Sequence, residues 1–138
     1  VGQLLRPQPI GATGYLAHLR EILLTLGHQG NVVIVGRGVE YVLPSQFGLR
    51  ARMVAPLEVR VERIAHRESL SPKAASVAVA ESDRARARLI RRHYGQTATD
   101  PLNHDVTVNT AELTIEAATE IVLTALQRKL ALPLRGGS

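Results

Sequence analysis

The sequence predicts an α/β fold with three layers, in which helices cover both faces of a mainly parallel sheet. Helical and strand-like periodicities alternate along the 138 residues, with short loops between them, which is typical of this class. Residues 31–35 form a β-branched run, as expected for a strand buried on both faces of a parallel sheet. Hydrophobic residues make up 45% of the chain and aromatic residues only 3%, so the core must be aliphatic.

The first helix is expected after an irregular segment. Residues 1–13 contain prolines and glycines and predict no element. Thr13 is placed to cap a helix that begins near Gly14 and ends at Gly27. Its hydrophobic residues recur at helical spacing, at Tyr15, Leu19, Ile22 and Leu26.

A second strand and a second helix are predicted in the middle of the chain. Hydrophobic residues occupy every second position of residues 49–55, with arginines at two of the positions between them, which predicts a strand. Pro56 suits the first turn of the helix that follows. Hydrophobic residues form one stripe of this helix, at Leu57, Val61, Ile64 and Ala65. Arginines form a separate stripe with i, i+3, i+7 spacing, at Arg60, Arg63 and Arg67.

A long helix and a third strand are predicted next. Ser71 is a good cap and Pro72 suits the first position of a helix that runs to about His93. A loop is expected at residues 95–103, and residues 105–109 alternate as a short strand.

The last helix completes the predicted domain. Thr114 is placed to cap it. Its buried face is predicted at Ala118, Ile121, Val122, Ala125 and Leu126. The domain is therefore expected to span residues 14–131, after the irregular segment at 1–13 and before a flexible tail at 132–138.

Charge indicates the class of partner. The chain carries 17 Lys+Arg against 12 Asp+Glu, and lysine occurs only at Lys73 and Lys129. Arginine suits phosphates and carboxylates, so nucleotides, nucleic acid or acidic surfaces are the expected partners. A genome that prefers arginine codons is the alternative explanation.

Other compositional features exclude several kinds of site. The absence of cysteine excludes disulfides and thiolate metal sites, and the five histidines show no metal-binding spacing. The sequence has no signal pattern and no apolar run of roughly 18–20 residues that would span a bilayer. We therefore expect a cytoplasmic protein with no membrane partner.

Gly36-Arg37-Gly38 is the first candidate binding segment, because it follows the predicted strand at 31–35. Ligands of open α/β sheets bind beyond the carboxyl ends of the strands. Glycines let the backbone approach a ligand closely, and the arginine between them can hold a phosphate or carboxylate. The alternative is a tight turn with a solvated arginine.

Arginines also cluster in the long helix. Arg84, Arg88 and Arg91 share one face through i, i+4, i+7 spacing. Their like charges repel each other unless an anion, such as a polyphosphate, lies among them. The alternative is a solvated face in which Glu81 and Asp83 balance arginines three residues further along.

Four segments of the chain form a recognisable set. They are NVVIVGRG at 31–38, RMVAPLEVRVERI at 52–64, SDRARARLIRRHYG at 82–95 and DVTVNTAELTIEAA at 105–118. In order and spacing the set resembles the cytidylate-kinase-like family of P-loop nucleoside monophosphate kinases. The resemblance implies a P-loop kinase type of sheet and phosphoryl transfer from ATP to CMP or dCMP, with Mg²⁺.

The resemblance also implies roles for particular residues. Contact with the acceptor nucleotide is implied for Gly36, Arg37 and Gly38, and a place near adenine for Asn109 and Thr110. The long helix would belong to a mobile lid, whose phosphate-binding candidates are Arg84, Arg86, Arg91 and Arg92. Further candidates in or next to the lid are Arg63, Arg67 and Asp83. Arg88 is a candidate only through its place on the same helical face, because no family arginine is expected at that position. No metal-binding side chain is implied.

The sequence departs from the family pattern in one decisive respect. The phosphate-binding loop Gly-x-x-x-x-Gly-Lys-Ser/Thr does not occur in it, and Gly38 and Ala85 stand where the family carries acidic residues. Phosphoryl transfer depends on this loop for positioning and charge stabilisation. We therefore expect this chain alone to be inactive, with ATP and Mg²⁺ as cofactors of the complete family protein. The alternative function is a non-catalytic basic α/β module that binds nucleic acid or mediates oligomerisation.

The absence of the loop also implies an incomplete sheet, because the strand before the loop is central in this fold. Either residues 31–35 pair directly with residues 49–55, or another segment fills the gap. That segment would come from a second copy of the chain or from an N-terminal segment outside this sequence. Unpaired strand edges favour such association.

The role of Arg37 can be tested by substitution. Arg37→Ala should weaken nucleoside monophosphate binding by about 1.5–3 kcal/mol, the range for a charge-assisted hydrogen bond. Calorimetry with CMP, on a form of the protein that carries the phosphate-binding loop, measures the change. Unchanged affinity would contradict the assignment.

Overall fold

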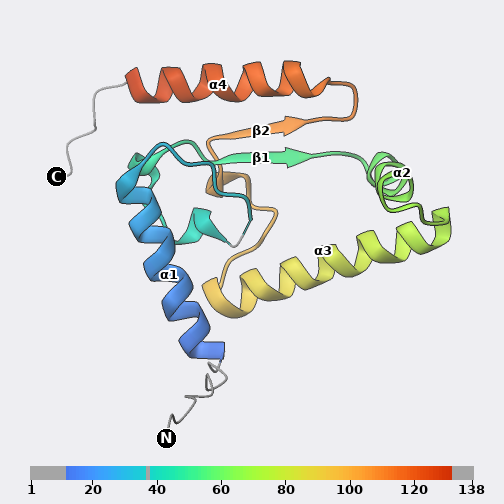
Figure 1. The fold of residues 1–138 in the computed structure, drawn as a ribbon, viewed down its shortest axis with the longest axis horizontal. Helices are drawn as coiled ribbons and strands as arrows, with labels where there is room; N and C mark the ends of the chain where they lie inside the picture. Colours follow the sequence, from blue (N-terminus) through green and yellow to red (C-terminus); the bar gives the residue numbers. More distant parts are fainter. Residues whose placement is uncertain (1–11, 37, 132–138) are drawn as a thin grey trace, which may run out of the picture. The chain divides into compact units, whose positions relative to one another are not determined.

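The computed structural model describes residues 12–36 and 38–131, which contain helices and short strands (Figure 1). The elements are α1 (Ala12–Gln29), η1 (Val39–Tyr41), η2 (Ser45–Phe47), β1 (Ala51–Val54), α2 (Leu57–Glu68), α3 (Pro72–Tyr94), η3 (Pro101–Asn103), β2 (Val106–Asn109) and α4 (Ile115–Ala131). The chain divides into two compact units, Val1–Phe47 and Gly48–Ser138. Among the described residues, no helix is both long and apolar enough to cross a membrane.

Helix α1 dominates the first unit. It begins at Ala12, so Thr13 lies inside the helix and does not cap it, and it extends two residues past its predicted end. Leu23 is buried, whereas Tyr15 and Ile22 of the predicted hydrophobic stripe are exposed. Gly27 lies inside the helix, where an added Cβ would come within 2.8 Å of a methyl carbon of Leu43. This glycine therefore permits close packing rather than ending the helix.

The predicted strand at residues 31–35 is wrong, since these residues form neither helix nor strand. Val33 is 90% exposed and Val35 is 85% exposed. A β-branched run is only a weak preference, and it becomes a strand when a neighbouring strand supplies hydrogen bonds and packing. The predicted pairing of 31–35 with 49–55 is therefore also wrong.

The sheet of the second unit consists of the parallel strands β1 and β2. Ala51 pairs with Val106 at one end of the ladder, and Val54 pairs with Asn109 at the other. Both strands lie within their predicted ranges. The intervening α2 and α3 form the crossover that a parallel pair requires. The unit is thus α/β, with the small sheet of an incomplete kinase-like fold.

The starts of α3 and α4 follow the predicted caps, whereas Pro56 precedes α2 instead of lying in its first turn. The Ser71 hydroxyl accepts a hydrogen bond from the Ala74 amide at 3.2 Å, and the Thr114 hydroxyl accepts one from the Ala117 amide at 3.1 Å. Each cap satisfies an amide that the first turn of a helix leaves without a partner. Gly95 ends α3 in the left-handed conformation, with φ 62°.

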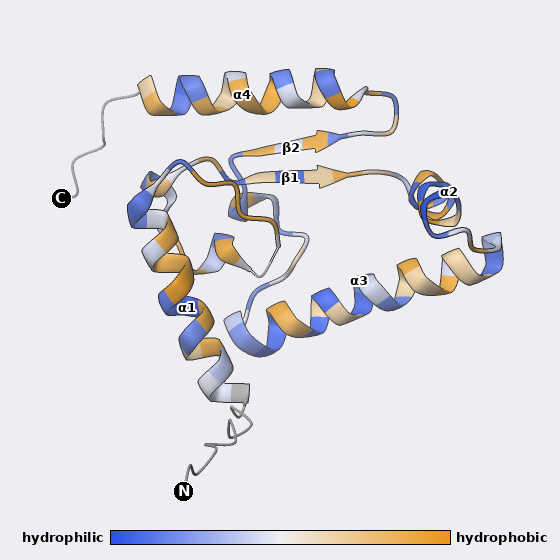
Figure 2. Ribbon diagram, viewed as in Figure 1, coloured by the Kyte–Doolittle hydropathy of each residue, from blue (hydrophilic) through white to orange (hydrophobic). Residues whose placement is uncertain are grey.

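Hydrophobic burial in this unit is sparse. Hydrophobic and hydrophilic turns alternate along α3 and α4 (Figure 2). Helix α4 runs beside β2 (Figure 1). Of its predicted buried face, Val122 and Leu126 are half-buried, whereas Ile121 remains 40% exposed.

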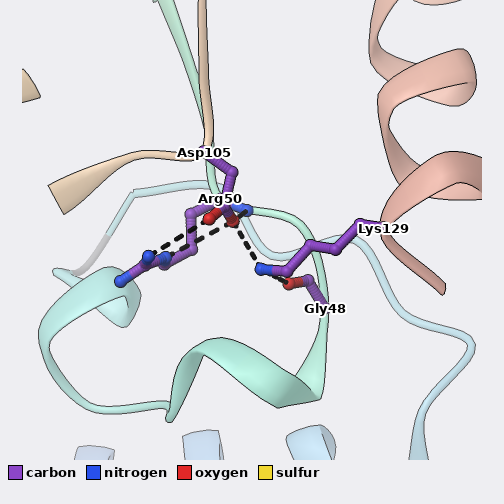
Figure 3. A network of polar contacts seen from close by, with 4 residues as sticks. All are labelled: Gly48, Arg50, Asp105 and Lys129. Atoms are coloured by element: carbon purple, nitrogen blue, oxygen red, sulfur yellow. Dashed lines mark hydrogen bonds and ion pairs between the residues drawn. The ribbon is translucent and has the colours of Figure 1, made fainter. Parts of the chain in front are cut away.

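A polar network joins the amino-terminal end of the sheet to α4 (Figure 3). The Asp105 carboxylate accepts hydrogen bonds from the Arg50 amide at 2.8 Å, from the Arg50 guanidinium group at 3.2 Å and from Lys129 Nζ at 2.7 Å. Lys129 Nζ also donates to the Gly48 carbonyl oxygen at 2.7 Å. These side chains are partly exposed, with 27% of the surface accessible for Arg50, 21% for Asp105 and 26% for Lys129.

The network changes the titration of Asp105. Partial burial alone would raise the pKa of this carboxyl group, but the hydrogen bonds from Arg50 and Lys129 outweigh burial. The pKa falls from its ordinary value of 3.8 to about 2. The charged carboxylate is therefore the form that the folded unit stabilises.

Asp105→Asn should lower the free energy of unfolding by about 1 kcal/mol near pH 7, allowing for solvent screening of a partly exposed group. Because the folded pKa lies below the ordinary value, the stabilisation is present above about pH 4 and is lost as the pH falls through about 2. Urea denaturation at several pH values measures both effects. Glu120→Gln, which neutralises an exposed carboxylate of α4, is the control. Equal stability of Asp105→Asn and the control near pH 7 would contradict the prediction.

Candidate functional site

The candidate site lies where the two parallel strands end. Directly after β2, the Thr110 amide donates to the Val54 carbonyl oxygen at 2.8 Å, and the Thr110 hydroxyl donates to the same oxygen at 3.2 Å. The Asn109 side-chain oxygen accepts from the Ala111 amide at 3.0 Å, which holds a tight turn. The two residues predicted to lie near adenine are therefore fixed at the carboxyl edge of the sheet.

Two arginines of α2 reach this edge. Arg63 donates to the Thr110 hydroxyl at 2.9 Å and also to the Thr110 carbonyl oxygen. Arg60, one turn earlier, donates through Nε to the Ala55 carbonyl oxygen at 3.1 Å. The helix follows β1 after Pro56, so its first two turns lie next to the strand ends. The structure thus joins Arg63 and Thr110, which the sequence placed in separate groups of candidates.

Arg60 also ties α2 to α3. Its Nη1 donates to both carboxylate oxygens of Asp83, at 2.9 and 2.8 Å. The side chain of Arg60 is 35% exposed and that of Asp83 is 56% exposed. Arg60 was in the predicted arginine stripe but not among the predicted site residues. Its i, i+3, i+7 spacing with Arg63 and Arg67 was the signal that could have included it.

A groove of about 680 Å³ lies between α2 and α3. Its volume is within the range of small-molecule sites. The lining residues are Arg60, Arg63, Ile64, Arg67, Glu68, Leu70, Ala78, Val79, Ser82 and Asp83. Guanidinium groups, carboxylates and a hydroxyl therefore share the groove with an aliphatic surface, an arrangement suited to an anion that also carries an apolar part.

The predicted lid residues divide between this groove and the surface of α3. Arg63, Arg67 and Asp83 line the groove, and Arg67 also pairs with Glu68 at 2.8 Å. The other lid candidates are exposed on α3 and are not among the groove residues, namely Arg84, Arg86, Arg88, Arg91 and Arg92. Their proposed phosphate contacts, and the mobility of the lid, remain predictions.

The acceptor segment belongs to the first unit. Arg37 lies outside the described residues. Gly36 and Gly38 have φ values of 75° and 65°, so both adopt the left-handed conformation that favours glycine. This geometry suits either alternative that the sequence left open, a tight turn or the approach of a ligand to the backbone.

Metal ligands do not gather in the described parts of the chain. Within residues 12–36 and 38–131, no group of three or more histidine, aspartate or glutamate residues is arranged to hold an ion.

The fold and the groove define a class, an α/β domain with arginines at the carboxyl edge of a parallel sheet. Comparison with known sequences identifies the family within that class. Residues 11–112 match the cytidylate kinase-like family, and the chain belongs to it. It is therefore a nucleotide kinase-like domain.

Known relatives agree with this assignment. The chain is 32% identical to a cytidylate kinase of Pyrococcus horikoshii over 98 residues, 71% of this chain and 50% of that protein. It is 28% identical to a cytidylate kinase of Sulfolobus acidocaldarius, over 79% of this chain and 60% of that protein. A uronate isomerase of Corynebacterium glutamicum is 32% identical over 84% of this chain, but only 22% of that protein is covered. The chain thus spans about half the length of the cytidylate kinases that it matches.

The contact between Arg63 and Thr110 can be measured as a coupling energy. Thr110→Val removes the hydroxyl that bonds both Arg63 and the Val54 carbonyl, so we expect a loss of about 1 kcal/mol of stability. A double-mutant cycle with Arg63→Met should give a coupling of roughly 0.5–1 kcal/mol by urea denaturation. Thr107→Val, at an exposed position of β2, should show no coupling to Arg63. Additive effects of the Thr110 and Arg63 changes would mean that the contact contributes nothing.

Proposed function

We propose that the complete protein transfers a phosphoryl group from ATP to CMP or dCMP, and that this chain supplies the lid and part of both nucleotide sites. The observation that carries the proposal is the contact of Arg63 with Thr110 at the carboxyl edge of the parallel strands. Ligands of α/β sheets bind at this edge. Membership of the cytidylate kinase-like family supports the choice of reaction.

The residues would act by binding and positioning. Thr110 and Asn109 would lie beside the adenine of ATP, and Arg63 and Arg67 would neutralise its phosphates. The exposed arginines of α3 would close over the phosphates, while Arg37 would hold the acceptor nucleotide. Guanidinium groups suit these tasks because they donate several hydrogen bonds in a fixed plane. The arginine-rich groove fits nucleotide phosphates, and Mg²⁺ bound to them would neutralise charge during transfer.

Catalysis requires a component that the sequence does not contain. The family's phosphate-binding loop supplies backbone amides, a lysine and a hydroxyl around the phosphates. The arginines of this chain would bind and orient nucleotides but would not replace those groups. The chain alone is therefore proposed to bind nucleotides without turnover.

The exposed arginines of α3 favour a second candidate, the binding of nucleic acid without catalysis. The two candidates differ in salt dependence. Contact with several backbone phosphates makes affinity fall steeply with salt, since each contact releases counterions. Binding of a mononucleotide should depend on salt much less.

Calorimetric titration of the 138-residue chain tests the proposal. We expect ATP to bind, and Arg63→Ala to weaken its binding by about 1.5–3 kcal/mol, because a charge-assisted contact is lost. Arg128→Ala, at an exposed position of α4, should leave the affinity unchanged. An assay of ADP formation with CMP should show turnover only in a form that carries the phosphate-binding loop. Tight, salt-sensitive binding of single-stranded RNA with no binding of ATP or CMP would favour the second candidate.

A further inference from the structure

We propose that Asp83 is an internal anion that occupies Arg60 in the absence of a ligand, and that a polyphosphate displaces it from the groove between α2 and α3. The inference rests on the proposed function, because it concerns the regulation of the same groove. In the state that the structure shows, the groove is partly closed against anions by the protein's own carboxylate.

The geometry of the Arg60–Asp83 pair carries the inference. Both oxygens of Asp83 lie within hydrogen-bond distance of a single nitrogen, Arg60 Nη1, at 2.9 and 2.8 Å. A phosphate oxygen is the same kind of charged acceptor as a carboxylate oxygen. Asp83 therefore occupies a position on Arg60 that a phosphate group would otherwise take.

The residues that line the groove carry more positive than negative charge, so they can bind a further anion. The groove is lined by three guanidinium groups and two carboxylates. Arg67 pairs with Glu68, whereas the two hydrogen bonds of Arg63 given above run to uncharged oxygens of Thr110. A ligand with two linked phosphates could thus bind Arg60 and Arg63, which lie one turn apart on α2.

The exchange requires little rearrangement. The Asp83 side chain is 56% exposed, so its carboxylate can turn into solvent. Breaking the ion pair costs little free energy, because an exposed ion pair contributes little to stability. Arg60 stays in place because its Nε remains bonded to the Ala55 carbonyl oxygen at 3.1 Å. The arginine is therefore positioned before the ligand arrives, and only its partner changes.

The test compares two variants of α3 that remove the same charge. Asp83→Asn removes the competing carboxylate, and Glu81→Gln neutralises an exposed residue two positions away that does not line the groove. Binding of inorganic pyrophosphate to the 138-residue chain is measured by calorimetry at fixed salt. Asp83→Asn should bind it about three- to fivefold more tightly than Glu81→Gln, as expected when a competing exposed ion pair is removed.

The outcomes separate this inference from the proposed function. If the wild type binds pyrophosphate but Asp83→Asn binds it no better than Glu81→Gln, Asp83 does not compete, and only this inference is overturned. Weaker binding by Asp83→Asn would show that Asp83 positions Arg60 for the ligand, and would overturn it too. If neither the wild type nor the variants bind pyrophosphate, the groove is not an anion site, and its role in the proposed function also fails.

A measurement on the wild type keeps the test independent of how the variants fold. Saturating pyrophosphate should shift the ¹³C signal of the Asp83 carboxyl carbon as the carboxylate leaves Arg60. The signal of Glu81 should stay where it is. An unchanged Asp83 signal at saturation would show that the ion pair survives binding, which contradicts displacement.

Discussion

The carboxylate of Asp105 holds together three chain segments at one end of the sheet. It bonds the residue that precedes β1 and, through Lys129, the last turns of α4. Hydrophobic packing alone does little to fix the arrangement of this unit, because few of its hydrophobic side chains are buried. Among its described residues, 48–131, the buried hydrophobic side chains are Ala75, Val79, Ile90 and Val108. A one-residue slip would turn each side chain to the opposite face of the sheet, so the polar contacts at Asp105 help to fix the register of the two strands.

The other end of the sheet is held by different chemistry. Thr110 satisfies the Val54 carbonyl oxygen through both its amide and its hydroxyl, and α2 sends Arg60 and Arg63 back to the strand ends. One end thus joins the strands to α4 through a carboxylate and a lysine. The opposite end gathers guanidinium groups, which is where the groove lies. The division gives the unit a structural end and an end that carries the candidate site.

The features that the sequence predicted correctly are mostly local. Ser71 and Thr114 cap their helices through atoms only three residues away, so a short segment contains the whole signal. The failed strand at 31–35 shows the opposite case, because a strand needs a partner that its own sequence does not specify. The family was also predictable, because four segments in fixed order carry information that no single segment has.

Local sequence patterns could not predict the residue pairs that form the candidate site. Arg60 and Asp83 are 23 residues apart, and Arg63 and Thr110 are 47 residues apart. Spacing along one helix showed that Arg60 and Arg63 share a face, but it could not show which residues face them. The sequence therefore predicted most of the participants, whereas the contacts depended on the crossover that brings α2 and α3 to the strand ends.

The attachment of α3 through Arg60 has a mechanical consequence. Helix α3 contains 23 residues, so at 1.5 Å per residue it is a rod about 35 Å long. Asp83, where Arg60 attaches, lies near the middle of this rod, so about 16 Å of helix extends from the joint to Tyr94. If this part turned by about 10° around the joint, its carboxyl end would move by roughly 3 Å. A small adjustment of the ion pair would thus move Arg91 and Arg92 farther than Arg84, which lies next to the joint.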